Sequence, residues 1–225
     1  MEKRMIRKII QRIRLYRQLR FFQYLYLNHF CKQVVRTDNS RILPYKGSVL
    51  DLAPGAKIYL GGNDMEIGYN RLNGAKTETL IRLRENAIWS CDGGCKIFYG
   101  ATIEVLRDAI LDSQYFTMNG TSVLIAAKKI HLGQDVMIGR SVIIYDSDHH
   151  TIRNMQGTVT NPDAPVFIGD HVWLATGSAV LKVSSIGSGC IVAANSVVRG
   201  YVPSGSLYQR ATIKENYGTW SREHP

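Results

Sequence analysis

A six-residue repeat constrains this chain more than any other feature of its sequence. From residue 168 to residue 203, six consecutive units read IGDHVW, LATGSA, VLKVSS, IGSGCI, VAANSV and VRGYVP. The first position is aliphatic in every unit, and the fifth is small or β-branched throughout. The first-position residues are Ile168, Leu174, Val180, Ile186, Val192 and Val198, and the fifth-position residues are Val172, Ser178, Ser184, Cys190, Ser196 and Val202. A fixed period of this kind is typical of a solenoid, in which each repeat buries its apolar side chain against its neighbours.

The geometry of the repeat predicts a triangular coil. Each unit supplies one short strand and one tight turn, and three units complete one coil, with small residues at the corners. The same spacing occurs at Leu132, Ile138 and Ile144, and it loosens to seven residues between Leu111 and Leu132. We therefore expect an all-β parallel β-helix domain over residues 39–203, with residues 204–225 as a C-terminal cap.

These repeats resemble those of the hexapeptide-repeat acyltransferases, which include O-acetyltransferases of capsule and lipopolysaccharide sugars. Three local motifs extend the resemblance: DSDHHTI at 146–152, IGDHVW at 168–173 and ANSVV at 194–198. The resemblance implies a left-handed helix, a homotrimer with active sites between subunits, and acetyl transfer from acetyl-CoA to a hydroxyl of a sugar or surface polysaccharide precursor. Two segments depart from the family: 181–187 lacks the usual glycine, and 206–214 replaces a Gly-Asn-Pro-Ala segment that helps close the CoA site.

The repeat stops between Ile144 and Ile168, and a polar loop at 147–165 with two adjacent histidines leaves the coil. Functional residues concentrate on loops that a rigid scaffold positions. A neutral imidazole suits the task of taking a proton from an attacking alcohol near neutral pH. We expect the base to be His150 or His149, with His150 favoured, and Asp148 or Asp146 to hold the other ring nitrogen.

The family pattern implies further site residues. Asn119 and Asp146 are expected to contact the acceptor. The acetyl-CoA site is expected to involve Trp173, Ala175, Gly177, Lys182, Ala193 and Arg199, with the small residues allowing close approach of the pantetheine arm and the basic ones reaching the phosphates. No metal is expected.

The basic charge of the chain belongs to its first 36 residues. They hold ten basic residues and one acidic residue, a net of +9 out of +10 for the whole chain, so the body is nearly neutral and nucleic-acid binding is not expected. Apolar residues recur at helical spacing over 3–30, within a predicted basic amphipathic segment at 1–38. This segment is expected either to lie on an anionic membrane surface or to pack on the protein, and the chain to be cytoplasmic, at most peripheral on the inner face of the membrane.

Two alternatives to an acetyltransferase stay open. A metal-dependent hydratase like the γ-class carbonic anhydrases needs three converging histidines, whereas His149 and His150 are adjacent. A non-catalytic β-helix scaffold is the other. Four scattered cysteines, Cys31, Cys91, Cys95 and Cys190, are expected to be reduced and partly buried.

Overall fold

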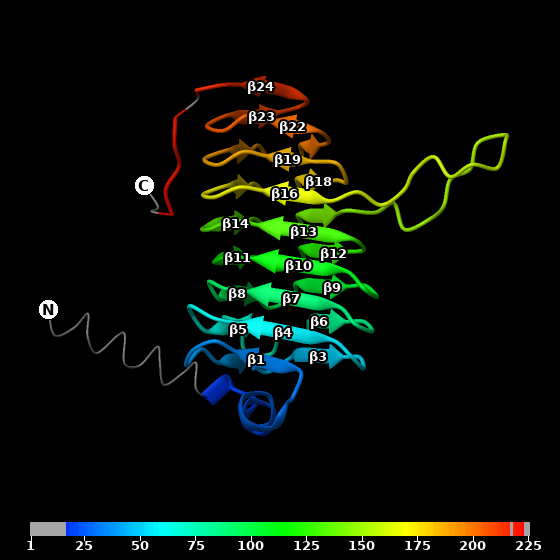
Figure 1. The fold of residues 1–225 in the computed structure, drawn as a ribbon. Helices are drawn as coiled ribbons and strands as arrows, with labels where there is room; N and C mark the ends of the chain where they lie inside the picture. The colour runs from blue at the N-terminus through cyan, green and yellow to red at the C-terminus, as the bar shows by residue number, and fades with distance from the viewer. Residues whose placement is uncertain (1–16, 217, 223–225) are drawn as a thin grey trace, which may run out of the picture.

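The computed structural model describes residues 17–216 and 218–222 and shows a stack of triangular coils (Figure 1). Successive strands alternate among three sheets, so strands three apart in sequence pair side by side. Sheet 1 contains β1 (Val34–Arg36), β4 (Lys57–Leu60), β7 (Ile88–Cys91), β10 (Ile110–Ser113), β13 (Lys129–Leu132), β16 (Val166–Ile168), β19 (Ser185–Ile186) and β22 (Tyr201–Val202). Sheet 2 contains β2 (Ile42–Pro44), β5 (Met65–Tyr69), β8 (Cys95–Phe98), β11 (Phe116–Met118), β14 (Val136–Ile138), β17 (Trp173–Leu174), β20 (Ile191–Val192), β23 (Leu207–Gln209) and β24 (Thr212–Lys214). Sheet 3 contains β3 (Ser48–Leu52), β6 (Thr79–Leu83), β9 (Thr102–Val105), β12 (Val123–Ala126), β15 (Ile143–Tyr145), β18 (Ala179–Val180) and β21 (Val197–Val198).

The strand register confirms that three six-residue units make one coil. Ile168 pairs with Ile186, Leu174 with Val192, and Val180 with Val198, each across 18 residues. Every first-position and fifth-position residue of the six units is buried. Two of the buried serines donate their hydroxyls to backbone carbonyls, Ser178 to Ala175 at 2.8 Å and Ser184 to Val198 at 3.1 Å. The repeat therefore builds a continuous apolar interior, as the sequence predicted.

The earlier coils are wider than the later ones. Ile88 pairs with Ile110 across 22 residues, and their strands are four residues long where the final coils have strands of two. The extra room admits large side chains, and Trp89 and Phe116 are fully buried with ring centroids 6.4 Å apart.

All four cysteines are free and buried, which confirms the expectation of unpaired, buried thiols. Burial raises the pKa of Cys95 well above its ordinary value.

The first coil is covered by a short helical segment, α2 (Phe21–Leu25) followed by the π-helix η1 (Tyr26–Phe30), at the blue end in Figure 1. Leu27 is buried in the core there. The predicted helix over 3–30 is interrupted, because Leu19 forms a β-bridge with Tyr45 and Arg20 has non-helical dihedral angles. Residues 1–16 of that prediction lie outside the described residues.

The last coil is covered by β24, which turns back antiparallel to β23. Residues 218–222 then descend the outside of the solenoid, as the red trace in Figure 1 shows. We call this segment the C-terminal strap. Within the described residues, no helix is long and apolar enough to cross a membrane.

Candidate functional site

The loop between β15 and β16 projects from the stack as an arm, seen at the right of Figure 1. Its outer half is a hairpin in which Arg153 and Val159 form an antiparallel bridge. Asn154 closes the turn, since its side-chain oxygen accepts the backbone N–H groups of Gln156 and Thr158. The arm is therefore an ordered projection at the place where the sequence predicted an inserted loop.

Both predicted histidines lie near the base of this arm and line one hollow of about 220 Å³. Its lining is Ser147, His149, His150, Thr151, Val159, Asn161, Pro162 and Asp163. His149 has a positive φ of 59°. Its ring packs edge-on against the ring of Tyr145, and the two ring centroids are 5.1 Å apart. Both imidazoles are exposed, and in the described part of the chain neither forms a hydrogen bond with a carboxylate. The prediction that Asp148 or Asp146 holds an imidazole nitrogen is wrong for this conformation.

Asp146 is a structural residue rather than an acceptor-binding one. Its carboxylate is fully buried and accepts the backbone N–H groups of Ala127, Lys128 and Lys129 at 2.6–2.8 Å. A carboxylate enclosed in this way cannot reach a bound acceptor, and it ties the first residue of the arm to the preceding coil.

Asp148 is paired with Lys182 instead of a histidine. Its Oδ2 lies 2.6 Å from the ammonium of Lys182 and 3.0 Å from the amide nitrogen of Asn161, and these contacts, in that order, hold the pKa of Asp148 below its ordinary value. Lys182 itself is 4% exposed. The expectation that Lys182 contacts CoA phosphates is therefore wrong in this structure, because a buried ammonium cannot reach them.

Asn119 lies at another corner of the coil. It follows β11, between sheets 2 and 3, and its side-chain amide donates to the carbonyl of Ile138 at 3.2 Å. The hollow beside the histidines lies where sheet 3 leads to sheet 1. The structure therefore does not bring Asn119 to the histidines within one chain.

The residues predicted to bind the acyl donor divide between two corners. Ala175, Gly177 and Ala193 follow strands of sheet 2, whereas Arg199 follows β21 of sheet 3. The positive charge of Arg199 also lowers the pKa of Asp148, by less than Lys182 and Asn161 do. The N–H groups of Ala175, Gly177 and Ala193 donate to backbone carbonyls of other coils, so they are not available to a pantetheine arm. Trp173 is half-buried on β17, on the outer side of sheet 2.

The C-terminal strap lies beside Trp173, which the sequence did not predict. Trp220 stacks on His171 at 4.1 Å with an interplanar angle of 4°, and its ring is 6.3 Å from that of Trp173. Arg222 pairs with Asp135 at 2.7 Å, and His171 contacts the other oxygen of the same carboxylate at 2.8 Å. Burial alone would raise the pKa of Asp135, but these hydrogen bonds together hold it below its ordinary value.

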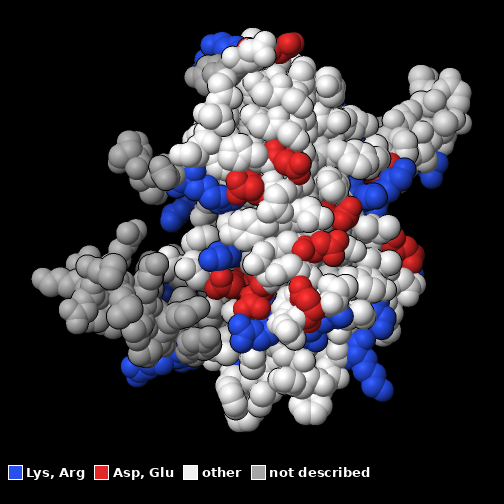
Figure 2. Space-filling view, turned by 60° about the vertical axis from the view of Figure 1, so that its left-hand side comes forward, with Lys and Arg blue, Asp and Glu red and all other residues white. Residues whose placement is uncertain are grey.

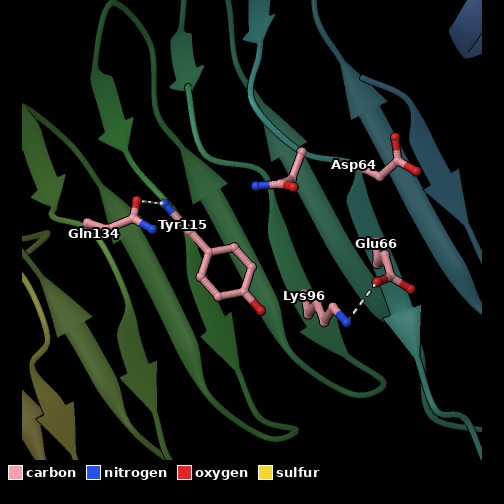
Figure 3. A pocket seen from close by; sticks show the side chains of 6 residues that line it. Asp64, Glu66, Lys96, Tyr115 and Gln134 are labelled. Carbon is pink, nitrogen blue, oxygen red and sulfur yellow. Dashed lines mark hydrogen bonds and ion pairs between the residues drawn. The ribbon is translucent and has the colours of Figure 1, made fainter. Parts of the chain in front are cut away.

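A second hollow, of about 480 Å³, opens over the earlier coils (Figure 3). Asn63, Asp64, Glu66, Lys96, Tyr115 and Gln134 line it. Its charged groups pair with neighbouring residues, since Lys96 lies 3.3 Å from Glu66 and Asp64 lies 2.9 Å from Arg41. The face in Figure 2 likewise shows acidic and basic side chains interleaved, in keeping with the near-neutral body.

The described residues contain no group of three or more His, Cys, Asp or Glu side chains that could hold a metal ion.

The sequence matches no family model. It is similar to WbbJ of Escherichia coli (strain K12), a proposed lipopolysaccharide biosynthesis O-acetyl transferase, with 30% identity over 111 residues, 45% of this chain and 56% of WbbJ. It is also similar to the polysialic acid O-acetyltransferase of Neisseria meningitidis, with 33% identity over 128 residues, 56% of this chain and 55% of that protein.

The chain thus spans about half the length of the curated relatives it matches. Among solved structures, the polysialic acid O-acetyltransferase OatWY superposes with a TM-score of 0.52 and 21% identity, covering 85% of this chain and 92% of that one. This likeness confirms the predicted left-handed parallel β-helix. In fold, and in sequence over about half its length, the chain resembles the hexapeptide-repeat acyltransferases.

Proposed function

We propose that this protein is an O-acetyltransferase that moves an acetyl group from acetyl-CoA to a hydroxyl of a sugar or surface polysaccharide precursor. The observation that carries the proposal is the pair of exposed imidazoles, His149 and His150, lining a hollow where the solenoid is interrupted. The functions for which the two relatives are named, acetyl transfer in lipopolysaccharide biosynthesis and to polysialic acid, support the reaction and the acceptor class.

We favour His150 as the general base. The ring of His149 is packed against Tyr145, whereas the backbone of His150 is fixed by a hydrogen bond from Asn161 to its carbonyl at 2.7 Å. In the reaction, the neutral imidazole takes the hydroxyl proton as the acceptor oxygen bonds to the thioester carbonyl carbon. The carbon–sulfur bond then breaks, and the imidazolium returns the proton to the CoA sulfur, so the enzyme ends unchanged.

The acyl donor is proposed to lie along the outside of the later coils, beside Trp173. This corner, between sheets 2 and 3, is not the corner that holds the histidines of the same chain, so the donor is proposed to face the arm of a neighbouring subunit. The exposed corner residues Thr176 and Ala194 lie next to the small residues Ala175 and Ala193, which leaves room for an extended chain. Trp173 would then wall one side of the thioester end. We assign Lys182 no contact with the donor.

Replacing Trp173 by alanine is expected to raise the KM for acetyl-CoA and its Kd by about tenfold, equivalent to about 1.4 kcal/mol, because an aromatic wall is lost. Calorimetric titration with acetyl-CoA measures the Kd directly. Phe22→Ala, which removes an exposed aromatic ring from α2 at the far end, is the matched control and should leave the Kd unchanged. Wild-type protein that binds no acetyl-CoA would contradict the proposed function and favour a scaffold.

We further propose that the active protein is a homotrimer. Large apolar side chains project from sheet 1 into solvent in the single chain, Phe167 and Tyr201 among them. Apolar surface of this kind on the outer face of one sheet suits a subunit interface.

The N-terminal segment 1–36 is proposed to hold the enzyme on the inner, cytoplasmic face of a membrane. Four aromatic side chains on and after α2 are more than half exposed: Phe21, Phe22, Tyr26 and Phe30. Together with the basic residues that precede them in the sequence, they match what an anionic lipid surface binds.

Replacing both Phe21 and Phe22 by serine is expected to weaken binding to vesicles containing anionic phospholipid by tenfold or more, on the order of 1.4 kcal/mol. Vesicle sedimentation measures the bound fraction, with Leu72→Ser as a control that removes an exposed apolar side chain from another part of the molecule. Unchanged partitioning of the double variant would mean that the segment packs on protein instead.

A further inference from the structure

Lys182 is a buried lysine with acceptors on three sides. It lies in the turn between β18 and β19, and its ammonium contacts Asp148 at 2.6 Å, the carbonyl of Asn161 at 3.0 Å and the carbonyl of Pro162 at 3.3 Å. Burying a charge is unfavourable unless it is paired and hydrogen-bonded, and here each requirement is met by the arm.

The three acceptors come from both ends of the arm. Asp148 belongs to the segment that leaves the coil, and Asn161 and Pro162 belong to the segment that returns to it. One side chain from the following coil therefore clamps the two segments of the arm together at its base.

Asn161 extends the clamp to the histidines. Its amide nitrogen donates to the carboxylate of Asp148 at 3.0 Å and to the carbonyl of His150 at 2.7 Å, and its oxygen accepts the N–H of Ile152 at 2.7 Å. The carbonyl of His150 and the N–H of Ile152 are thus connected to Lys182 through the side chains of Asn161 and Asp148.

The turn that presents Lys182 is itself strained. Val183 has a φ of +66°, a left-handed conformation that β-branched residues rarely adopt. Backbone strain of this kind persists only where the surrounding structure holds it. Here the strained residue directly follows Lys182, whose ammonium is buried against the arm.

We infer that Lys182 is a positioning residue, which sets the place of His150 by clamping the base of the arm through Asp148 and Asn161. This inference rests on the proposed function, because it concerns the histidine assigned as the base. It differs from the role expected by resemblance, in which Lys182 would bind the phosphates of CoA.

The test compares Lys182→Met, which keeps the length of the side chain, with Lys182→Arg, which keeps the charge. Lys182→Met is expected to lower kcat by about 10–100-fold, because small displacements of a catalytic group are costly, while the KM for acetyl-CoA changes less than about twofold. Lys182→Arg should recover part of the lost kcat. Lys128→Met is the control, since Lys128 also donates to the arm, at Asp163, but from an exposed position at 3.4 Å, and it should retain the wild-type kcat.

A phosphate contact would produce the opposite split, with a raised KM and an unchanged kcat, and would overturn the inference. Because Lys182→Met can affect folding, Asp148→Asn breaks the same ion pair from the exposed side and is expected to lower kcat in the same direction. A wild-type kcat in both variants would also overturn the inference while leaving the proposed function intact.

Hydrogen exchange of residues 147–163 gives a readout that does not need activity. In Lys182→Met the amides of this segment are expected to exchange at least about tenfold faster than in the wild type, with exchange at β12 and β13 unchanged. If the wild type transfers no acetyl group but this difference appears, the proposed function fails and the clamp stands. Equal exchange in both proteins would contradict the clamp.

Discussion

Replacing His150 by alanine is expected to lower kcat for acetyl transfer by about 10²–10⁴-fold, the usual contribution of a positioned general base. The loss should appear in kcat rather than in the Kd for acetyl-CoA, because the imidazole acts on the acceptor hydroxyl and the donor is proposed to lie beside Trp173. Steady-state kinetics with a glycan acceptor, together with calorimetry for the donor, separates the two effects.

His149→Ala is the matched comparison, because the two histidines are adjacent on one hollow. Its ring packs on Tyr145, so its removal is expected to cost less than about tenfold in kcat through loss of local packing. A larger loss in His149→Ala than in His150→Ala would transfer the role of base to His149.

Replacing Trp89 by alanine is expected to lower the free energy of unfolding by about 3–5 kcal/mol, as large-to-small changes of buried aromatic residues do. Trp89 is fully buried, lies 6.4 Å from the ring of Phe116, and donates from Nε1 to the hydroxyl of Ser113 at 3.0 Å. Alanine leaves a cavity between coils and removes a buried hydrogen bond. Urea unfolding followed by circular dichroism measures the change.

Leu72→Ala is the control for that experiment, since Leu72 is 62% exposed and its removal should change the free energy of unfolding by no more than about 0.5 kcal/mol. Because each coil is stabilised by its neighbours, a defect in the early coils should also loosen the adjoining ones. A Trp89→Ala variant as stable as the wild type would mean that the wide coils repack around the gap.

The parts of the fold that repeat could be predicted from sequence because their cause is local and periodic. A first-position aliphatic such as Ile168 or Leu174 is buried by the same coil geometry at every turn, and the register across 18 residues follows. The inserted arm could be found for the same reason, as an interruption of that period.

The side-chain partners at the site could not be predicted, because they join residues far apart in the sequence. Asp148 stands next to two histidines in the sequence, yet its closest partner is Lys182 on the following coil. Asp146 accepts hydrogen bonds from backbone N–H groups of a preceding turn. Trp220 donates a hydrogen bond to the carbonyl of His171, which is 49 residues earlier in the sequence. The burial of Lys182 could not be predicted from its position in a turn, because most lysines are exposed to solvent.

The most direct measurement is transfer of labelled acetyl from acetyl-CoA to a panel of nucleotide sugars and surface glycans, by the wild type and by His149→Ala/His150→Ala. The wild type is expected to acetylate at least one acceptor, and the double variant to lose about 10²–10⁴-fold in rate while still binding acetyl-CoA. Transfer by the double variant at the wild-type rate would contradict the assignment of an imidazole of the arm as the base.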